Sequence, residues 1–136
     1  MTAKRRNKLR KLAWDFPKLK TYGPNEGQIL LVGWGSSQGP IREAVDRARA
    51  AGDSVSSIHI RHINPLPPGL ENIFSGFNHV LVVEMNDEGL YGFGQLGALL
   101  RARYCDAKIQ GINKTDGLTF KVKEIVDGVA RLDATP

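Results

Sequence analysis

The sequence of 136 residues contains a single cysteine, Cys105. One thiol excludes an intramolecular disulfide, a four-cysteine zinc site and an iron–sulfur cluster held by this chain alone. We expect its side chain to be buried at a helix end rather than to act as a nucleophile. No apolar run approaches the roughly 18–20 residues of a membrane helix, and no apolar segment follows the basic N-terminus as in a signal peptide. These absences favour a cytoplasmic protein without membrane contact.

Acidic residues are scarce at the N-terminus, so charge is distributed unevenly along the chain. The formal net charge is +5, but the first 20 residues carry eight Lys or Arg and one acid. The remainder is nearly neutral, and its composition indicates no basic face for nucleic-acid binding. Within 3–16, Leu9, Leu12, Ala13 and Phe16 recur at helical spacing. We expect a helix that docks on protein, and contact with RNA or an acidic surface stays an alternative.

Beyond this arm, short apolar runs alternate with amphipathic segments. Pro17 and the turn-rich residues 21–27 separate the arm from the rest, so we divide the chain into 1–27 and 28–136. The alternation predicts an α/β domain: a three-layer, mostly parallel sheet of four to five strands with helices on both faces, with an antiparallel edge strand left open. Expected strands cover 29–32, 55–63, 79–85 and 107–113, and expected helices begin at Pro40 and cover 69–76, 95–104 and 120–132.

The stretch GWGSSQGP follows the first expected strand and raises the question of a bound anion. Glycines and a helix N-terminus together can hold a phosphate. However, the glycine spacing departs from G-x-G-x-x-G, and the Lys-Ser/Thr of a P-loop is missing. We favour a strand-to-helix turn that meets another protein surface, with a serine as helix cap, and anion binding stays the alternative. The candidate residues are Gly33, Gly35, Ser36, Ser37, Gln38 and Gly39.

Other polar residues stand at the expected strand ends, where α/β folds bind ligands. Asn64 follows the second expected strand, Glu84 and Asn86 lie at the end of the third, and Asn113 and Lys114 lie at the end of the fourth. If the strand order is of the flavodoxin type, the loops after the first and third strands flank the ligand crevice. We take these five residues as interface or strand-end candidates.

Two further patterns could carry chemistry. Glu84 with Asp87 and Glu88 could perform acid–base work, but we favour capping of the next helix or an interface role. The three histidines do not form the H-E-x-x-H spacing of a zinc protease, and we expect no metal site.

Several longer segments together resemble a known family. They are KRRNKLRKLAWDFP, ILLVGWGSSQGPIREAV, HIRHINPLPPGL, HVLVVEMN, GQLGALLRARY and INKTDGLTFKVKEI, in this order. From about Lys4 to Leu132 the chain resembles the C-terminal region of the alpha subunit of 2-oxoacid:ferredoxin oxidoreductases, most like the 2-oxoglutarate enzymes. The resemblance implies a fold similar to the transketolase C-terminal domain.

The resemblance also implies a reaction for the whole enzyme, in which a 2-oxoacid and coenzyme A give an acyl-CoA, carbon dioxide and reduced ferredoxin. In that family thiamine diphosphate, magnesium and an iron–sulfur cluster are held by other domains and by the beta subunit. This chain lacks the G-D-G…N-N type of motif for diphosphate and magnesium, since the TDG at 115–117 has no such continuation. We therefore expect no catalytic residue and no cofactor bound by this chain alone.

The role expected for the chain is subunit assembly with the remaining alpha-subunit domains and the beta subunit, with ferredoxin reached through the complex. A homodimer is left open. The alternative is a stand-alone α/β module that binds a phosphate-bearing ligand at the turn from Gly33 to Gly39. The loop from Asp87 to Phe93 is longer than in many relatives, and its role is open.

Overall fold

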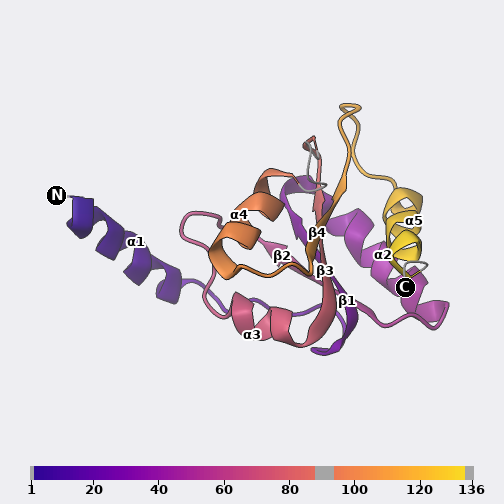
Figure 1. Ribbon diagram of the computed structural model, residues 1–136, viewed down its shortest axis with the longest axis horizontal. Helices are drawn as coiled ribbons and strands as arrows, with labels where there is room; N and C mark the ends of the chain where they lie inside the picture. The colour runs from indigo at the N-terminus through magenta and orange to yellow at the C-terminus, as the bar shows by residue number, and fades with distance from the viewer. Residues whose placement is uncertain (1, 88–93, 134–136) are drawn as a thin grey trace.

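The computed structural model describes residues 2–87 and 94–133, which form a sheet covered on both faces by helices, with one helix projecting from the body (Figure 1). Glu88, a candidate for acid–base or capping work, and most of the loop from Asp87 to Phe93 lie outside the described residues. In chain order the elements are α1 (Thr2–Asp15), β1 (Gly27–Trp34), the 3-10 helix η1 (Gly35–Ser37), α2 (Gln38–Ala50), β2 (Val55–Ile60), α3 (Leu70–Ser75), β3 (Phe77–Glu84), α4 (Gln95–Tyr104), β4 (Ile109–Asn113) and α5 (Val122–Asp133).

The sheet has the strand order β2-β1-β3-β4, and each neighbouring pair is parallel. The expected three-layer α/β fold of the flavodoxin strand order is confirmed, with four strands in the described part of the chain. Antiparallel pairing occurs as an isolated bridge between Tyr22 and Ser57 on the outer edge of β2. β2 is shorter than expected because its pairing with β1 ends at Trp34 and Ile60, where β1 gives way to η1.

Two apolar cores lie on the two faces of the sheet, with α2 and α5 over one and α3 and α4 over the other (Figure 1). Alternate side chains of β1 enter opposite cores: Ile29 and Leu31 pack with α2 and α5, and Leu30 and Val32 with α3 and α4. This is why the run ILLV is continuously apolar, since a central parallel strand is buried on both sides.

Helix ends follow the sequence signals only in part. Gly52 has a φ of +96°, and the amides of Gly52 and Asp53 donate to the carbonyls of Arg49 and Ala48. This is a Schellman ending of α2 at the expected glycine. Cys105 does end α4, in a left-handed conformation with φ of 52°, but it is exposed and not buried as expected. In the described residues no helix combines the length and apolarity that a bilayer span requires.

A buried carboxylate fixes the start of α4. Glu84, at the end of β3, is 1% exposed, and its Oε1 and Oε2 accept hydrogen bonds from the amides of Leu96 (2.6 Å) and Gly97 (3.0 Å). These amides belong to the first turn of α4, which lacks partners within the helix and carries partial positive charge. Gly94, the N-cap residue, has no side chain to cap them. The expected capping role of Glu84 is thus observed, from a strand rather than from the helix's own start.

A second polar link joins the end of β4 to α5. The Nζ of Lys114 lies 2.8 Å from Oε1 of Glu124 and 3.4 Å from Oδ2 of Asp116, and it donates to the carbonyl of Thr119. The hydrogen bond to Lys114 is the main cause that lowers the pKa of Glu124, and the bond to Glu124 is the main cause that raises the pKa of Lys114. These contacts tie the end of β4 to the loop that follows it and to the first turn of α5.

Replacing Glu84 tests the buried cap. In Glu84→Gln one of the two α4 amides faces an NH₂ group instead of an oxygen, so the free energy of unfolding should fall by about 1–3 kcal/mol. Urea unfolding followed by circular dichroism measures the change. The matched control is Glu71→Gln, whose carboxylate is solvent-exposed and should leave the midpoint nearly unchanged. Equal midpoints for the two variants would contradict the structural importance of the cap.

The pH dependence of stability tests the Lys114 link. Because the pKa of Glu124 is lowered on folding, its contribution is present at neutral pH and lost as pH falls through the folded-state pKa. Lys114→Met should therefore lower stability at pH 7, and its deficit against the parent chain should shrink in acid. The control Lys123→Met removes an exposed lysine of α5. Thermal unfolding from pH 7 to pH 3 measures both, and a deficit independent of pH would contradict the assignment.

Candidate functional site

The turn after β1 is held by packing and backbone conformation. A Cβ on Gly33 would collide with Cδ1 of Ile41, and Gly35 has a φ of +71°, so both positions favour glycine. Gly39 has an ordinary φ and open space around it, so the structure gives no reason for glycine there. The expectation of a serine cap is wrong: Ser37 occupies the N-cap position of α2, but its hydroxyl donates to the carbonyl of Trp34 (3.1 Å). The hydroxyl makes this bond because η1 brings it back over the end of β1.

Three of the strand-end candidates converge between β3 and β4. Asn86 Nδ2 donates to Glu84 Oε1 (3.3 Å), and Asn113 Nδ2 donates to the carbonyl of Asn86 (3.0 Å). A Cβ on Gly94 would lie 2.6 Å from both Glu84 Oε2 and Asn113 Nδ2, so the cluster closes tightly on the start of α4. The amide of Lys114 adds a bond to the carbonyl of Glu84. Asn113 Oδ1 is buried without a partner.

The polar cluster at the ends of β3 and β4 stabilises the fold, and it leaves no free carboxylate for catalysis at Glu84. Both oxygens of Glu84 are taken by α4 amides, so its carboxylate is not free for the acid–base work that the sequence left open. Asn64 follows β2, on the opposite edge of the sheet from β4, and does not join the cluster. In residues 2–87 and 94–133, no group of three His, Cys, Asp or Glu side chains could hold a metal ion.

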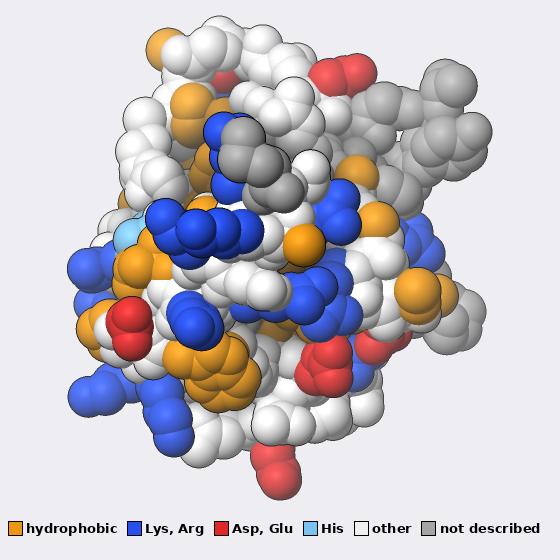
Figure 2. Space-filling model, turned by 90° about the vertical axis from the view of Figure 1, so that its left-hand side faces the viewer, with side chains coloured by type: hydrophobic (Ala, Val, Ile, Leu, Met, Phe, Trp, Pro, Cys, Tyr) orange, Lys and Arg blue, Asp and Glu red, His pale blue; other side chains and the backbone are white. Residues whose placement is uncertain are grey.

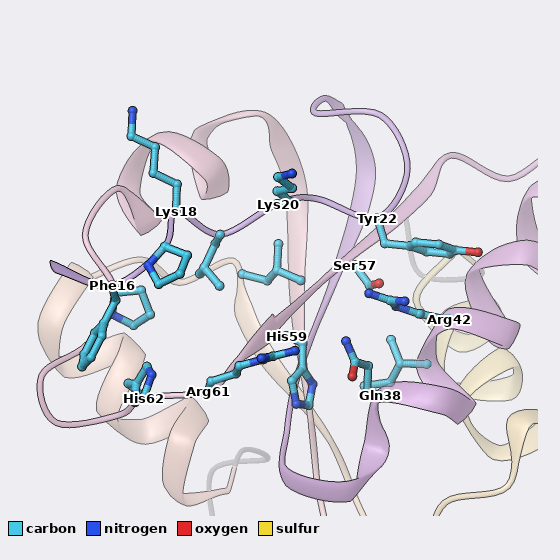
Figure 3. Close-up of a pocket in the computed structure, with 15 residues that line it drawn as sticks. Phe16, Lys18, Lys20, Tyr22, Gln38, Arg42, Ser57, His59, Arg61 and His62 are labelled. Carbon is cyan, nitrogen blue, oxygen red and sulfur yellow. The ribbon is translucent and has the colours of Figure 1, made fainter. Parts of the chain in front are cut away.

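A second region was not predicted from the sequence. A hollow of about 390 Å³ lies along the outer edge of β2, between α2 and the segment that joins α1 to β1. Figure 3 shows Arg42, Arg61 and Gln38 pointing into it, whereas Lys18 points away. Phe16 and His62 are stacked at one end, with ring centroids 3.9 Å apart. We call this the basic hollow. Its polar lining residues are Lys18, Lys20, Tyr22, Gln38, Arg42, Ser57, His59, Arg61 and His62.

The basic hollow is lined by four Lys or Arg side chains, those of Lys18, Lys20, Arg42 and Arg61. None of the residues that line it in the described chain is Asp or Glu. Burial of the imidazole is the main cause that lowers the pKa of His59, and the charges of Arg61 and Arg42 lower it further, so the neutral form is favoured. Its Nδ1 is buried without a hydrogen-bond partner. The arrangement can bind an anion, and it offers two guanidinium groups and an amide for that purpose.

The hollow escaped sequence reasoning because its residues come from three separated segments. The lysines lie between α1 and β1, Gln38 and Arg42 lie on the first turns of α2, and His59 and Arg61 lie at the end of β2. Beyond the N-terminal arm the composition is nearly neutral, which conceals a local excess of cations. The parallel pairing of β1 with β2 brings α2 beside the end of β2, and the bridge between Tyr22 and Ser57 holds the segment between α1 and β1 along the same edge.

Two curated proteins are related to this chain in sequence. The chain is 37% identical over 110 residues to the 2-oxoglutarate oxidoreductase subunit KorA of Mycobacterium tuberculosis, covering 80% of this chain and 16% of that protein. It is 38% identical over 123 residues to the alpha subunit of 2-oxoacid:ferredoxin oxidoreductase 1 of Aeropyrum pernix, covering 88% of this chain and 18% of that protein. The chain therefore spans about a sixth of the length of these relatives.

Solved structures and a family match complete the comparison. The 2-oxoglutarate:ferredoxin oxidoreductase of Magnetococcus marinus, with 2-oxoglutarate, coenzyme A and succinyl-CoA bound, superposes with a TM-score of 0.83 at 28% identity, over 96% of this chain and 22% of that one. A split-gene transketolase, at 17% identity and a TM-score of 0.62 over 82% of this chain and 40% of that one, shares the fold alone. Residues 27–125 match the family described as pyruvate:ferredoxin oxidoreductase core domain II. The chain belongs to this family and is similar to a domain of the alpha subunits of 2-oxoacid:ferredoxin oxidoreductases.

Proposed function

We propose that the chain acts as an assembly domain in a 2-oxoacid:ferredoxin oxidoreductase, most like the 2-oxoglutarate enzymes. The observation that carries the proposal is α1. This helix projects from the body (Figure 1), and Ala13 is its buried residue. Leu9 and Leu12 are 38% and 43% exposed and Trp14 is 77% exposed. A helix of 14 residues is marginally stable in water without tertiary packing, so α1 is expected to have a partner.

The partner we propose for α1 is the remaining part of the same alpha subunit. The relatives are about six times longer than this chain, so most of the subunit that would cover α1 is absent from the structure. Figure 2 looks at the face from which α1 projects and shows Lys and Arg side chains interspersed with hydrophobic ones. Such a face suits a partner surface that is apolar at its centre and acidic around it.

We propose that the chemistry of the complex is the conversion of a 2-oxoacid and coenzyme A to an acyl-CoA and carbon dioxide, with electrons passed to ferredoxin. Support comes from the name of the mycobacterial relative and from the ligands in the Magnetococcus structure. The cofactors proposed for the complex are thiamine diphosphate, magnesium and an iron–sulfur cluster. The residues here do not fit a cluster, because the chain has one cysteine, so we assign these cofactors to other parts of the complex.

The first test of this proposal is the activity of the isolated chain. Because both oxygens of Glu84 are engaged and the chain has one cysteine, the pure chain with thiamine diphosphate, magnesium, coenzyme A and 2-oxoglutarate should not reduce a viologen dye. The assembled complex should do so under the same conditions. Dye reduction by the chain alone would overturn the assignment as an assembly domain.

The second test replaces the apolar stripe of α1. Leu9 and Leu12 lie on one side of the helix, so Leu9→Ala with Leu12→Ala removes contact area while keeping residues that favour helix. Affinity for the rest of the alpha subunit, co-expressed and weighed by native mass spectrometry, should fall by about tenfold or more. The control Asn7→Ala changes the opposite side of the helix and should bind as the parent does. Unchanged affinity in the double variant would show that α1 does not carry the contact.

A further inference from the structure

We propose that the basic hollow binds a phosphate-bearing small molecule of about nucleotide size. The inference does not depend on the assembly role of α1. It rests on the shape of the hollow, on two arginines that have no anionic partner among the described residues, and on the contacts that hold Arg42 in place. The site is distinct from the turn at Gly33–Gly39, because of those turn residues only Gln38 lines the hollow.

The shape of the hollow suits a small ligand. Its volume of about 390 Å³ falls within the range of pockets that enclose small molecules. Pro17 and Leu19 contribute apolar surface, and Phe16 stacked on His62 forms a flat aromatic end. Cationic groups and apolar walls together match a ligand with a charged end and a planar or apolar body.

The arginines of the hollow differ from others in the body of the domain. Arg47 pairs with Glu43 at 2.9 Å, Arg103 lies 3.7 Å from Glu71, and Arg49 donates to the carbonyl of Val55. In the described residues neither Arg42 nor Arg61 reaches a carboxylate or a carbonyl oxygen. Two unpaired guanidinium groups that converge in a concavity (Figure 3) provide several donors for a phosphate, which accepts hydrogen bonds on three oxygens.

Contacts with Tyr22 hold the Arg42 side chain in a position where it can bind a phosphate. Its guanidinium carbon lies 5.0 Å from the centroid of the Tyr22 ring, in a cation–π contact. The hydroxyl of Tyr22 in turn donates to the carboxylate of Asp46 at 3.0 Å and 3.1 Å. Asp46, the acid one helical turn from Arg42, is therefore held by the tyrosine hydroxyl. The backbone bridge between Tyr22 and Ser57 fixes the ring over β2, so Arg42 is positioned but its donors stay available.

Isothermal titration calorimetry of the chain at fixed ionic strength tests the proposal with three probes: ADP, pyrophosphate and adenosine. We expect ADP or pyrophosphate to bind and adenosine to bind far more weakly, because the phosphate supplies the charge. Stronger binding of ADP than of pyrophosphate would assign the apolar walls to a nucleoside. Stronger or equal binding of pyrophosphate would restrict the ligand to its phosphate part. Binding of adenosine as strong as that of ADP, or no heat from either phosphate probe at millimolar concentration, would overturn the proposal.

Matched variants identify the hollow as the place of binding. Arg42→Gln and Arg61→Gln should each weaken phosphate binding by about tenfold. Arg47→Gln, on the same helix and with the same change of charge, should bind as the parent does. The triple change Lys4→Gln, Arg5→Gln and Arg6→Gln controls for attraction by the N-terminal arm. Equal loss in Arg47→Gln, or loss only in the triple variant, would show nonspecific attraction and overturn the site.

Two further measurements test whether the variants still fold and whether the hollow stays accessible in the assembled alpha subunit. Circular dichroism and unfolding midpoints for Arg42→Gln and Arg61→Gln verify that a loss of binding is not a loss of fold. The titration is then repeated on the assembled alpha subunit, where Arg42-dependent binding should persist. Its disappearance there would overturn the proposal, because the hollow would then be covered by protein. Neither result alters the test of α1, which uses different residues.

Discussion

The burial of β1 on both faces is the constraint on which the rest of the domain depends. Residues 29–32 are each no more than 1% exposed, so the strand needs a helical layer above and below it and a strand on each edge. The crossovers through α2 and α3 place β2 and β3 on its two sides. Because such crossovers are right-handed, α2 and α3 cover opposite faces of the sheet. The polar features at the sheet edges all take their positions from this arrangement.

Within that frame, Glu84 shows how a buried charge can serve architecture instead of chemistry. A carboxylate with so little exposure is costly unless its lone pairs are satisfied. Here the α4 amides satisfy it, and the helix N-terminus adds a favourable field. The same contact draws in Asn86 and Asn113, which complete a polar plug between β3 and β4. A cluster of acids and amides at a strand end, the usual place for a ligand in this type of fold, is thus occupied by the protein itself.

The fold could be predicted because local signals agreed with the global arrangement. The apolar run at 29–32 and the Val-rich segment that became β3 marked buried strands, and Gly52 marked the end of α2. Two expectations about side chains were wrong. One side chain bonds to a competing local partner, and the other lies at the surface and not in the core. Ser37 is drawn to the carbonyl of Trp34 by η1, and Cys105 takes a left-handed C-cap position at the surface. Neither the 3-10 helix η1 nor the exposure of the C-cap residue Cys105 could be predicted from the sequence pattern.

The polar cluster at the ends of β3 and β4 could be predicted in part from the sequence, whereas the basic hollow could not. The sequence places Glu84 and Asn113 at the ends of two expected strands, and the parallel pairing of β3 with β4 brings those ends together. The basic hollow could not be predicted, because it needs the tertiary path of the segment between α1 and β1. That segment supplies Phe16 and Lys20 to the wall of the hollow, and it also determines the direction in which α1 leaves the body. Tyr22 fastens it to β2 through two backbone hydrogen bonds. One short connection therefore shapes both surfaces that the described residues leave uncovered, the apolar stripe on α1 and the hollow beside β2.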